Sequence, residues 1–250
     1  MKFIGHLDIM RYFQKAFRRA GIDVAYSQGY SPHQLISFAA PLGVGLTSEG
    51  EYLDMQLNTP ISKEEVLKLM NATMAEGIQV TDFAPLKEGC IKSMTAVAGS
   101  DYMVSLKTGY EGYENFAENF NKFMSQEQIV VVKRARKAGK KDVELDIRPF
   151  VYIYSLNAED FAEKTGQSSD LSQADVYEND NVVFLQVCTG SVDNLKPELV
   201  MEAFAQYMGK EYNPFAYQIH RMEVYANDVT KEEKEAGKRN LVPLSQYETE

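Results

Sequence analysis

The sequence is poor in the features that define several classes of protein. Its two cysteines, Cys90 and Cys188, lie far apart and form no CxxC pair. That spacing is typical of a reducing cytoplasm, with thiols that pack rather than bind metal. No apolar run approaches the roughly 20 residues of a membrane helix, and the first residues do not have the pattern of a signal peptide. We therefore expect a cytoplasmic protein with no membrane segment.

Common catalytic and cofactor-binding motifs are also missing. The sequence contains no GxxxxGKS/T phosphate loop, no dinucleotide-binding GxGxxG, no HExxH and no GxSxG. Two cysteines are too few for an iron–sulfur site. We expect no cofactor, no metal and no catalytic motif of the chain's own.

Acidic residues outnumber basic ones, 36 against 26, but the excess is not uniform. Residues 1–40 contain five Lys and Arg, two Asp and no Glu, together with two of the three histidines. The net charge of −10 argues against a protein that covers nucleic acid with its whole surface. It leaves room for a local basic site near the start of the sequence.

Residues 7–20 have the period of an amphipathic helix. With successive residues about 100° apart, the apolar side chains fall in one arc and the cations in the opposite arc. The apolar arc consists of Ile9, Met10, Phe13, Ala16, Phe17 and Ala20. Gly21 follows as a C-cap signal. The segment predicts a helix with a cationic outer face.

The rest of the first half predicts a small sheet. Residues 35–42, 50–57 and 78–86 are typical of strands. Between the last two strands, Ser62 and Glu65 have the spacing of a capping box, which marks a helix start. With a short strand before the first helix, the order is β-α-β-β-α-β, the split ferredoxin-like unit.

The second half repeats this order with additions. Strands are predicted at residues 101–108, 128–134, 143–146, 181–187 and 216–225, and helices at 111–125 and 197–208. We expect an α+β protein with two tandem ferredoxin-like domains and antiparallel-dominated sheets. The expected parts are a first domain at 1–86, a linker at 87–100, a second domain at 101–226 with an insertion near 157–180, and a polar tail at 227–250.

The outer face of the first helix is one candidate site. Arg11, Lys15 and Arg18 are spaced i, i+4 and i+7, so their heads line up over about 10 Å of helix, and Arg19 adds a fourth cation. Such a row can meet the phosphates of a nucleic acid. The alternatives are a solvated face, or one paired with acidic groups of another helix or of a partner protein.

Two histidines fall on either side of this helix. His6 and Asp8 of GHLD can form an oriented general base, but a carboxylate in the first turn also caps free N–H groups. The stretch YSQGYSPH then places Tyr26, Tyr30 and His33 around a glycine, as in a base-stacking platform. Packing of the tyrosines is the alternative.

Further cations occur in the second half. Residues 133–141, KRARKAGKK, hold six cations, among them Lys133, Arg134 and Arg136. Clustered like charges repel, so a polyanionic or acidic partner is favoured over a solvated hairpin tip. Arg148 precedes Pro149, which fixes an extended path and can present the guanidinium at a defined angle.

Several separated motifs resemble one known family. They are FIGHLDIMRYFQKAFRRAG, YSQGYSPHQ, VELDIRPFVY, TGSVDNLKPELV and HRMEVY. In this order they resemble the bacterial radical SAM-linked (or radical SAM-associated) proteins of unknown function, over nearly all of residues 3–225. The resemblance implies genomic pairing or fusion with a cobalamin-binding-type radical SAM protein, and genes of RNA metabolism nearby. Members carry about ten more residues before the position of Phe3, so we expect the first strand to be incomplete.

Three functions remain open. The first is a noncatalytic RNA-binding or substrate-presenting partner of a radical SAM enzyme. The chain is not itself such an enzyme, because two cysteines cannot make a CxxxCxxC loop. The second is a stand-alone RNA-processing enzyme that uses His6 or His33. The third is a subunit that docks a protein through its acidic surface and does not touch RNA.

Overall fold

The computed structural model of the chain describes residues 2–133, 143–167, 171, 174, 177 and 179–249. The chain divides into two compact units. Unit 1 consists of Met1–Leu46, Gly50–Val97 and Val224–Glu250, and unit 2 of Thr47–Glu49 and Ala98–Glu223. Both contain helices and strands, and antiparallel pairs predominate, which confirms the predicted α+β class. None of the helices in the described ranges combines the length and apolar character that a bilayer crossing requires.

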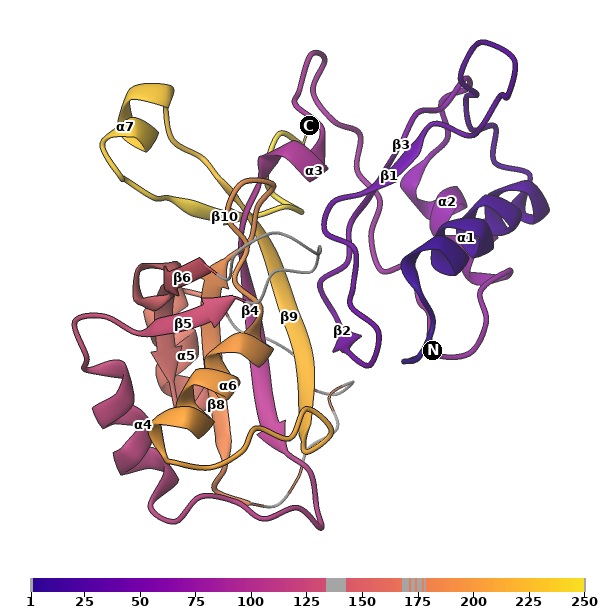
Figure 1. Cartoon of the computed structure of the whole chain (residues 1–250). Helices are drawn as coiled ribbons and strands as arrows, with labels where there is room; N and C mark the ends of the chain where they lie inside the picture. Colours follow the sequence, from indigo (N-terminus) through magenta and orange to yellow (C-terminus); the bar gives the residue numbers. More distant parts are fainter. Residues whose placement is uncertain are drawn as a thin grey trace. The chain divides into compact units, whose positions relative to one another are not determined.

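Unit 1 contains one long helix and several short elements (Figure 1). Its helices are α1 (His6–Ala20), α2 (Lys63–Asn71), α3 (Ser93–Ala96) and α7 (Lys231–Glu235). The strands β1 (Ile36–Phe38) and β3 (Leu53–Met55) form an antiparallel pair. The strand β10 (Leu241–Pro243) pairs antiparallel with the last residues of β9 (Tyr217–Asn227).

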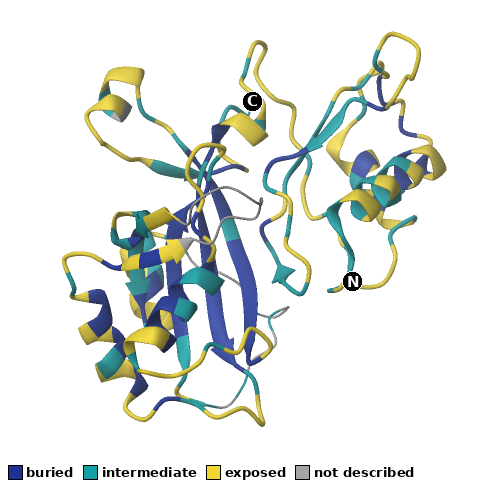
Figure 2. Ribbon diagram, viewed as in Figure 1, coloured by how far each residue is buried: buried dark blue, intermediate teal, exposed yellow. Residues whose placement is uncertain are grey.

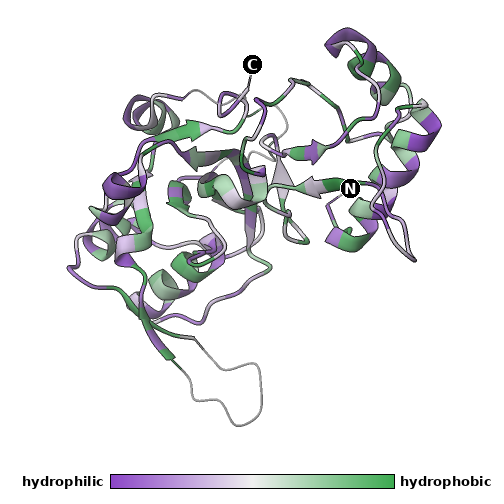
Figure 3. Cartoon of the chain, turned by 90° about the horizontal axis from the view of Figure 1, so that it is seen from above, coloured by the Kyte–Doolittle hydropathy of each residue, from purple (hydrophilic) through white to green (hydrophobic). Residues whose placement is uncertain are grey.

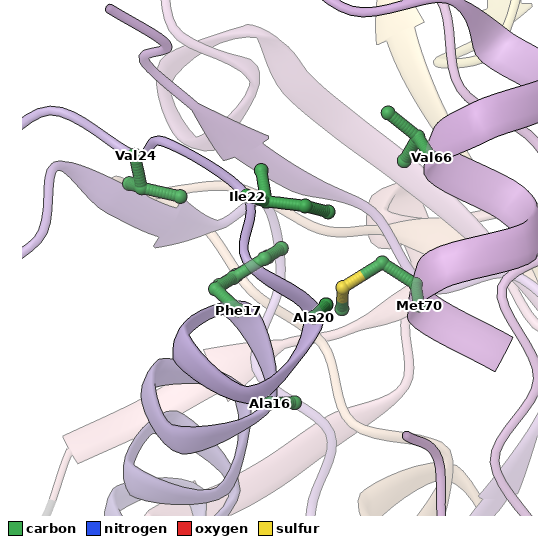
Figure 4. Packing of buried hydrophobic residues seen from close by; sticks show 7 residues of the cluster. All are labelled: Ala16, Phe17, Ala20, Ile22, Val24, Val66 and Met70. Atoms are coloured by element: carbon green, nitrogen blue, oxygen red, sulfur yellow. The ribbon is translucent and has the colours of Figure 1, made fainter. Parts of the chain in front are cut away.

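The apolar arc of α1 faces the core of unit 1. Buried residues from α1, from the segment after it and from α2 form this core: Ala16, Phe17, Ala20, Ile22, Val24, Val66 and Met70. Figure 4 shows the side chains of both helices directed toward one another. Because removing apolar area from water is the main stabilising term, this packing fixes which face of α1 is buried. The cationic arc of α1 therefore faces away from this core.

The predicted end of α1 and the predicted start of α2 are confirmed. Gly21 adopts a left-handed conformation, with φ at 70°. Its N–H donates to the carbonyl of Arg18, and that of Ile22 to the carbonyl of Phe17 at 3.1 Å, as in a Schellman motif. At the start of α2, the Ser62 hydroxyl accepts from the N–H of Glu65 at 3.2 Å. Both ends follow from signals within a few residues.

Several predicted strands of the first half are shorter or absent. Of residues 35–42 and 50–57, only the short β1 and β3 form a ladder, and neither residues 2–4 nor 78–86 form a strand. The Asn71 side chain accepts from the N–H of Val80 and donates to its carbonyl, both at 2.8 Å. A side chain thus occupies backbone groups that a neighbouring strand would need. The tandem ferredoxin-like arrangement is not confirmed.

Unit 2 is built on a larger sheet. The strand order is β9-β4-β8-β7, and β2 also pairs with β9. The strands are β2 (Thr47–Ser48), β4 (Val97–Leu106), β7 (Val151–Ser155) and β8 (Val182–Cys188), and a separate antiparallel hairpin is formed by β5 (Val130–Lys133) and β6 (Val143–Asp146). The helices are α4 (Phe116–Met124), α5 (Ala158–Thr165) and α6 (Pro197–Tyr207), with a 3-10 turn at Arg148–Phe150.

The centre of this sheet is buried, as the dark blue strands of Figure 2 show. Phe120 of α4 and Phe204 of α6 lie with their ring centroids 5.0 Å apart. The hairpin differs, because Val130 and Val132 of β5 and Val143 of β6 are each more than half exposed. Figure 3 is coloured by hydropathy, and it shows green, hydrophobic segments in the strands of this hairpin.

The structure adds regular elements to the predicted linker, insertion and tail. Within 87–100, α3 begins at Ser93, whose N–H and hydroxyl both donate to the Asp54 carboxylate. Within 157–180, α5 is capped by the Asn157 side chain. Within 227–250, α7 and β10 form, and Leu244 is buried. In each stretch, side-chain contacts supply order that the polar composition did not indicate.

Candidate nucleic-acid interface

The row of cations predicted on α1 lies on its exposed face. Arg11, Lys15 and Arg18 are all exposed, whereas Ala16 and Phe17 between them are buried. Residues three and four apart on a helix are neighbours, so the three heads form one row about 10 Å long. We call Arg11, Lys15 and Arg18 the cationic row.

The cationic row is only partly neutralised within the protein. The Arg11 guanidinium lies 3.3 Å from the Asp8 carboxylate, and both side chains are about two-thirds exposed. Nε of Arg18 donates to the helix carbonyl of Gln14 at 3.2 Å, which leaves its charge unpaired by an acid in the described residues. The Lys15 ammonium makes no hydrogen bond or ion pair within the described ranges. Exposed pairs such as Arg11–Asp8 are weak, so the row can exchange them for phosphates.

Arg19 has a different role. Its Nη2 donates to the carbonyl of Thr73 at 3.3 Å, and its guanidinium lies 5.9 Å from the ring centroid of Tyr12. These contacts tie the end of α1 to the segment after α2. We therefore leave Arg19 out of the cationic row.

The tyrosine loop, residues 26–34, follows α1 closely. Its base is closed by hydrogen bonds from the N–H of Ser27 to the carbonyl of His33 at 2.8 Å and from the N–H of His33 to the Ser27 hydroxyl at 3.1 Å. Gly29 has a φ of 115°, a region that suits glycine. Tyr30 at the tip is fully exposed, and Tyr26 is 45% exposed.

Sequence separation limits how far this loop lies from the cationic row. Four residues connect Gly21 to Tyr26, and an extended chain covers at most about 3.6 Å per residue. The start of the loop is therefore within roughly 20 Å of the end of α1. A single strand of a few nucleotides can span that distance, so unit 1 holds cations and exposed aromatic rings within reach of one ligand.

The predicted histidine chemistry is only partly assembled. The His6 ring packs edge-on against Phe38, with centroids 5.7 Å apart, while Asp8 contacts Arg11. Nδ1 of the exposed His33 lies 2.8 Å from the Ser27 hydroxyl. In the part of the chain that the structure describes, no hydrogen bond or ion pair joins the His6 ring to Asp8 or to His33. His33 is thus the better oriented of the two rings.

Among the site cations predicted in unit 2, the structure describes only the side chain of Arg148. Arg134, Arg136 and the side chain of Lys133 lie outside the described residues. Nε of Arg148 donates to the carbonyl of Met124 at 3.0 Å, and Nη1 donates to that of Val151 at 3.3 Å. This guanidinium therefore joins the end of α4 to the start of β7, and it serves the fold of unit 2.

A comparison with known protein families identifies the family of the chain. A family model described as an uncharacterized protein conserved in bacteria, DUF2344, matches residues 1–197. The chain belongs to the DUF2344 family. No curated protein matches the sequence significantly. The match contains the whole cationic row and the tyrosine loop of this DUF2344 protein, and the description names no activity, so the function has to be argued from the surface itself.

A buried polar group on β9 was missed by the sequence reasoning. His220 of the DUF2344 protein is fully buried, and its Nδ1 lies 2.8 Å from the Thr47 hydroxyl. Its Nε2 lies 3.5 Å from the Glu49 carboxylate. Thr47 and Glu49 both come from the segment that forms β2, 171 or more positions before His220. No local spacing could have brought them together, because the pairing of β2 with β9 does so.

A shallow cavity of about 340 Å³ in unit 2 was also missed. Residues of α4, β7 and α5 line it, including Asn121, Tyr154, Asp160 and Lys164. The Lys164 ammonium contacts Asp160 at 2.6 Å, as does the Ser155 hydroxyl, and both lower the pKa of that carboxyl. Its charged groups therefore already satisfy one another, which makes this cavity a weaker candidate than unit 1.

Proposed function

We propose that the protein is a noncatalytic RNA-binding subunit that presents RNA to a partner enzyme. The observation that carries the proposal is the exposed cationic row on α1, in a chain of net charge −10, beside a loop with an exposed tyrosine tip. Cations hold the phosphate backbone by charge-assisted contacts, and aromatic rings stack on unpaired bases. Both are needed for single-stranded RNA, whose bases are free to leave the stack.

The proposed partner is a radical SAM protein of the cobalamin-binding type. Its support is the sequence resemblance of the GHLD, YSQGYSPH, DIRPF and HRMEVY stretches. Exposed acidic residues of unit 2, such as Glu118 and Glu159, are the proposed contacts for this protein partner. In this arrangement the partner supplies the chemistry and the present chain supplies the substrate.

We also infer that unit 2 follows the split β-α-β plan. In chain order its four main sheet strands are β4, β7, β8 and β9, and their order in the sheet is fourth, first, third, second. Helix α4 lies between the first pair and α6 between the last. This inference concerns the fold alone, because many functions share the plan.

Binding of a labelled single-stranded RNA, followed by fluorescence anisotropy, tests the proposal. We expect Arg18→Glu to weaken binding about tenfold and to flatten the dependence of affinity on salt, because phosphate contacts release counterions. Lys68→Glu is the matched control, since Lys68 is an exposed cation of α2 in the same unit. Equal effects of the two variants, or no binding by the wild type, would remove α1 from the function.

A second function, RNA cleavage, is favoured by one observation. The Ser27 hydroxyl holds Nδ1 of His33, and the imidazole is otherwise exposed, as a general base requires. Purified protein would then cleave RNA, and His33→Ala would abolish the cleavage while His6→Ala would leave it. Intact RNA after prolonged incubation with wild type excludes this second function.

The proposed partner is tested in cells by crosslinking and capture of the tagged full chain. Recovery of a radical SAM protein together with a discrete RNA is the expected result. Recovery of that protein without RNA would instead indicate a docking subunit, with the cationic row as a protein contact.

A further inference from the structure

Gln34 lies at the base of the tyrosine loop, directly opposite Tyr26. The two form an antiparallel bridge, flanked by hydrogen bonds from Ser27 to His33 and from Leu35 to Ala25, each 2.8 Å. In this pattern the bridged residues are a non-hydrogen-bonded pair, whose side chains lie close together on one face. The side chains of Gln34 and of the half-exposed Tyr26 therefore start from neighbouring points on the same face.

The oxygen of the Gln34 amide has no hydrogen-bond donor among the described residues. The side chain is 5% exposed, and its Oε1 is buried. Buried polar atoms are normally paired, because an unpaired acceptor loses its hydration and gains nothing in return. Rotation of this side chain toward a ligand would break no hydrogen bond of Oε1. A hydrogen-bond donor on the ligand would remove the cost of burying this oxygen without a partner.

We propose that Gln34 and Tyr26 together bind an unpaired adenine base, which makes Gln34 a specificity-determining residue of the RNA-binding surface. This inference rests on the proposed function. The base would stack on the ring of Tyr26, as bases do on exposed aromatic side chains. The Gln34 amide would then accept from the exocyclic N6 amine and donate to N7, the bidentate match between glutamine and adenine.

Uracil lacks an exocyclic amine, so it cannot give this pair of hydrogen bonds at the same edge. The cationic row, by contrast, contacts phosphates and does not distinguish bases. The structure therefore assigns affinity and base preference to different residues of unit 1. Substitution can separate the two.

The experiment compares full-length wild type with Gln34→Met, a variant of similar side-chain shape that has no amide. Oligoadenylate and oligouridylate of about 12 nucleotides, a length within the usual site size, are the probes. We expect wild type to prefer oligoadenylate about tenfold. Gln34→Met should bring the ratio close to one, without changing the affinity for oligouridylate or its salt dependence.

Each of the remaining outcomes contradicts a different part of the proposal. Equal binding of both probes by wild type, or an unchanged ratio in Gln34→Met, overturns the role of Gln34 and leaves RNA binding by the cationic row intact. If neither probe binds, the proposed function fails and this inference with it. Adenosine monophosphate is the third probe: affinity equal to that of oligoadenylate would show a free nucleotide site and overturn the RNA assignment.

Thermal unfolding controls for damage to the fold. Because Gln34→Met removes a buried, unpaired oxygen, its midpoint should equal or exceed that of wild type. A lower midpoint would mean that the amide is satisfied within the protein, which contradicts the observation that carries the inference. The wild-type preference for oligoadenylate remains a test that needs no variant.

Discussion

Helix α1 of unit 1 and helices α4 and α5 of unit 2 are all amphipathic, but they differ in how their cations are neutralised. Lys122 of α4 contacts Glu118, and Lys164 of α5 contacts Asp160, each at 2.6 Å and four residues apart. On α1, the residue four positions before Lys15 is Arg11.

Like charges at that spacing oppose helix formation, whereas an acid before a base supports it. Helix α1 thus retains a repulsion that α4 and α5 avoid. Nothing within the described fold of unit 1 requires that repulsion, but a polyanionic ligand would relieve it. The comparison separates cations that serve a helix from cations that are available to a ligand.

The largest expected effect is on the free energy of unfolding. It tests whether the buried faces of α1 and α4 contribute equally to stability. Phe17 of α1 and Phe120 of α4 are both buried. Truncating either to alanine should lower the free energy of unfolding by about 3–5 kcal/mol, because each leaves a cavity in a packed core. Denaturant unfolding followed by circular dichroism measures both. A much smaller loss for Phe17→Ala would mean that α1 is held mainly by its surface contacts.

Charge reversal in the middle of each helix should separate binding from stability. Lys15→Glu should lower RNA affinity about fivefold, since one phosphate contact is replaced by a repulsion, whereas Lys122→Glu should leave affinity unchanged. For stability we expect the opposite: Lys122→Glu should be the more destabilising of the two, because it creates a like-charge pair with Glu118. Lys15→Glu removes such a pair. Anisotropy titrations and thermal melts of the same preparations give both readings.

A smaller change gives α1 the charge pattern of α4. Gln14 lies four residues before Arg18. Gln14→Glu should stabilise the helix by about 0.2–0.5 kcal/mol and weaken RNA binding a few-fold, because the new carboxylate competes with phosphate for Arg18. Gln14→Ala is the control that changes the side chain without adding charge. Tighter RNA binding by Gln14→Glu would contradict an anionic ligand on this face.

The smallest effect concerns the Glu118–Lys122 ion pair of α4, whose spacing of four residues has no counterpart among the ion pairs described on α1. Lys122 holds the pKa of Glu118 below its ordinary value of 4.5. A lowered carboxyl pKa contributes stability above the ordinary value, and this contribution is lost as the pH falls through the lowered one. The small difference in unfolding midpoint between wild type and Glu118→Gln should therefore be constant near neutral pH and vanish in acid. A difference that grows on acidification would contradict the pairing.

Signals between neighbouring residues were enough to predict α1. Features that depend on contacts between distant residues could not be predicted. The helical period and Gly21 gave the buried face of α1, its end and the exposure of Arg11, Lys15 and Arg18, because all of these depend on neighbours in sequence. The hydrogen bond from Arg19 to the carbonyl of Thr73 could not be predicted in this way, because the two residues are 54 positions apart.

Strands were harder to predict than helices for the same reason. Residues 78–86 have the apolar alternation of a strand, but a strand also needs a partner, and Asn71 takes the backbone groups of Val80 instead. The contact between Thr47 and His220 spans 173 positions and has no local signature. The unpaired Oε1 of Gln34 likewise has no local signature, because its burial depends on residues that are distant in sequence.

The interleaving of the two units constrains how the chain can fold. Unit 2 takes Thr47–Glu49 from the first fifth of the sequence, and unit 1 takes Val224–Glu250 from its end. Neither unit can therefore be completed on the ribosome before the last strands are synthesised, and closing such long loops slows folding. A contiguous fragment of residues 98–223 would leave His220 without Thr47 and Glu49, so such a fragment does not contain the whole of unit 2.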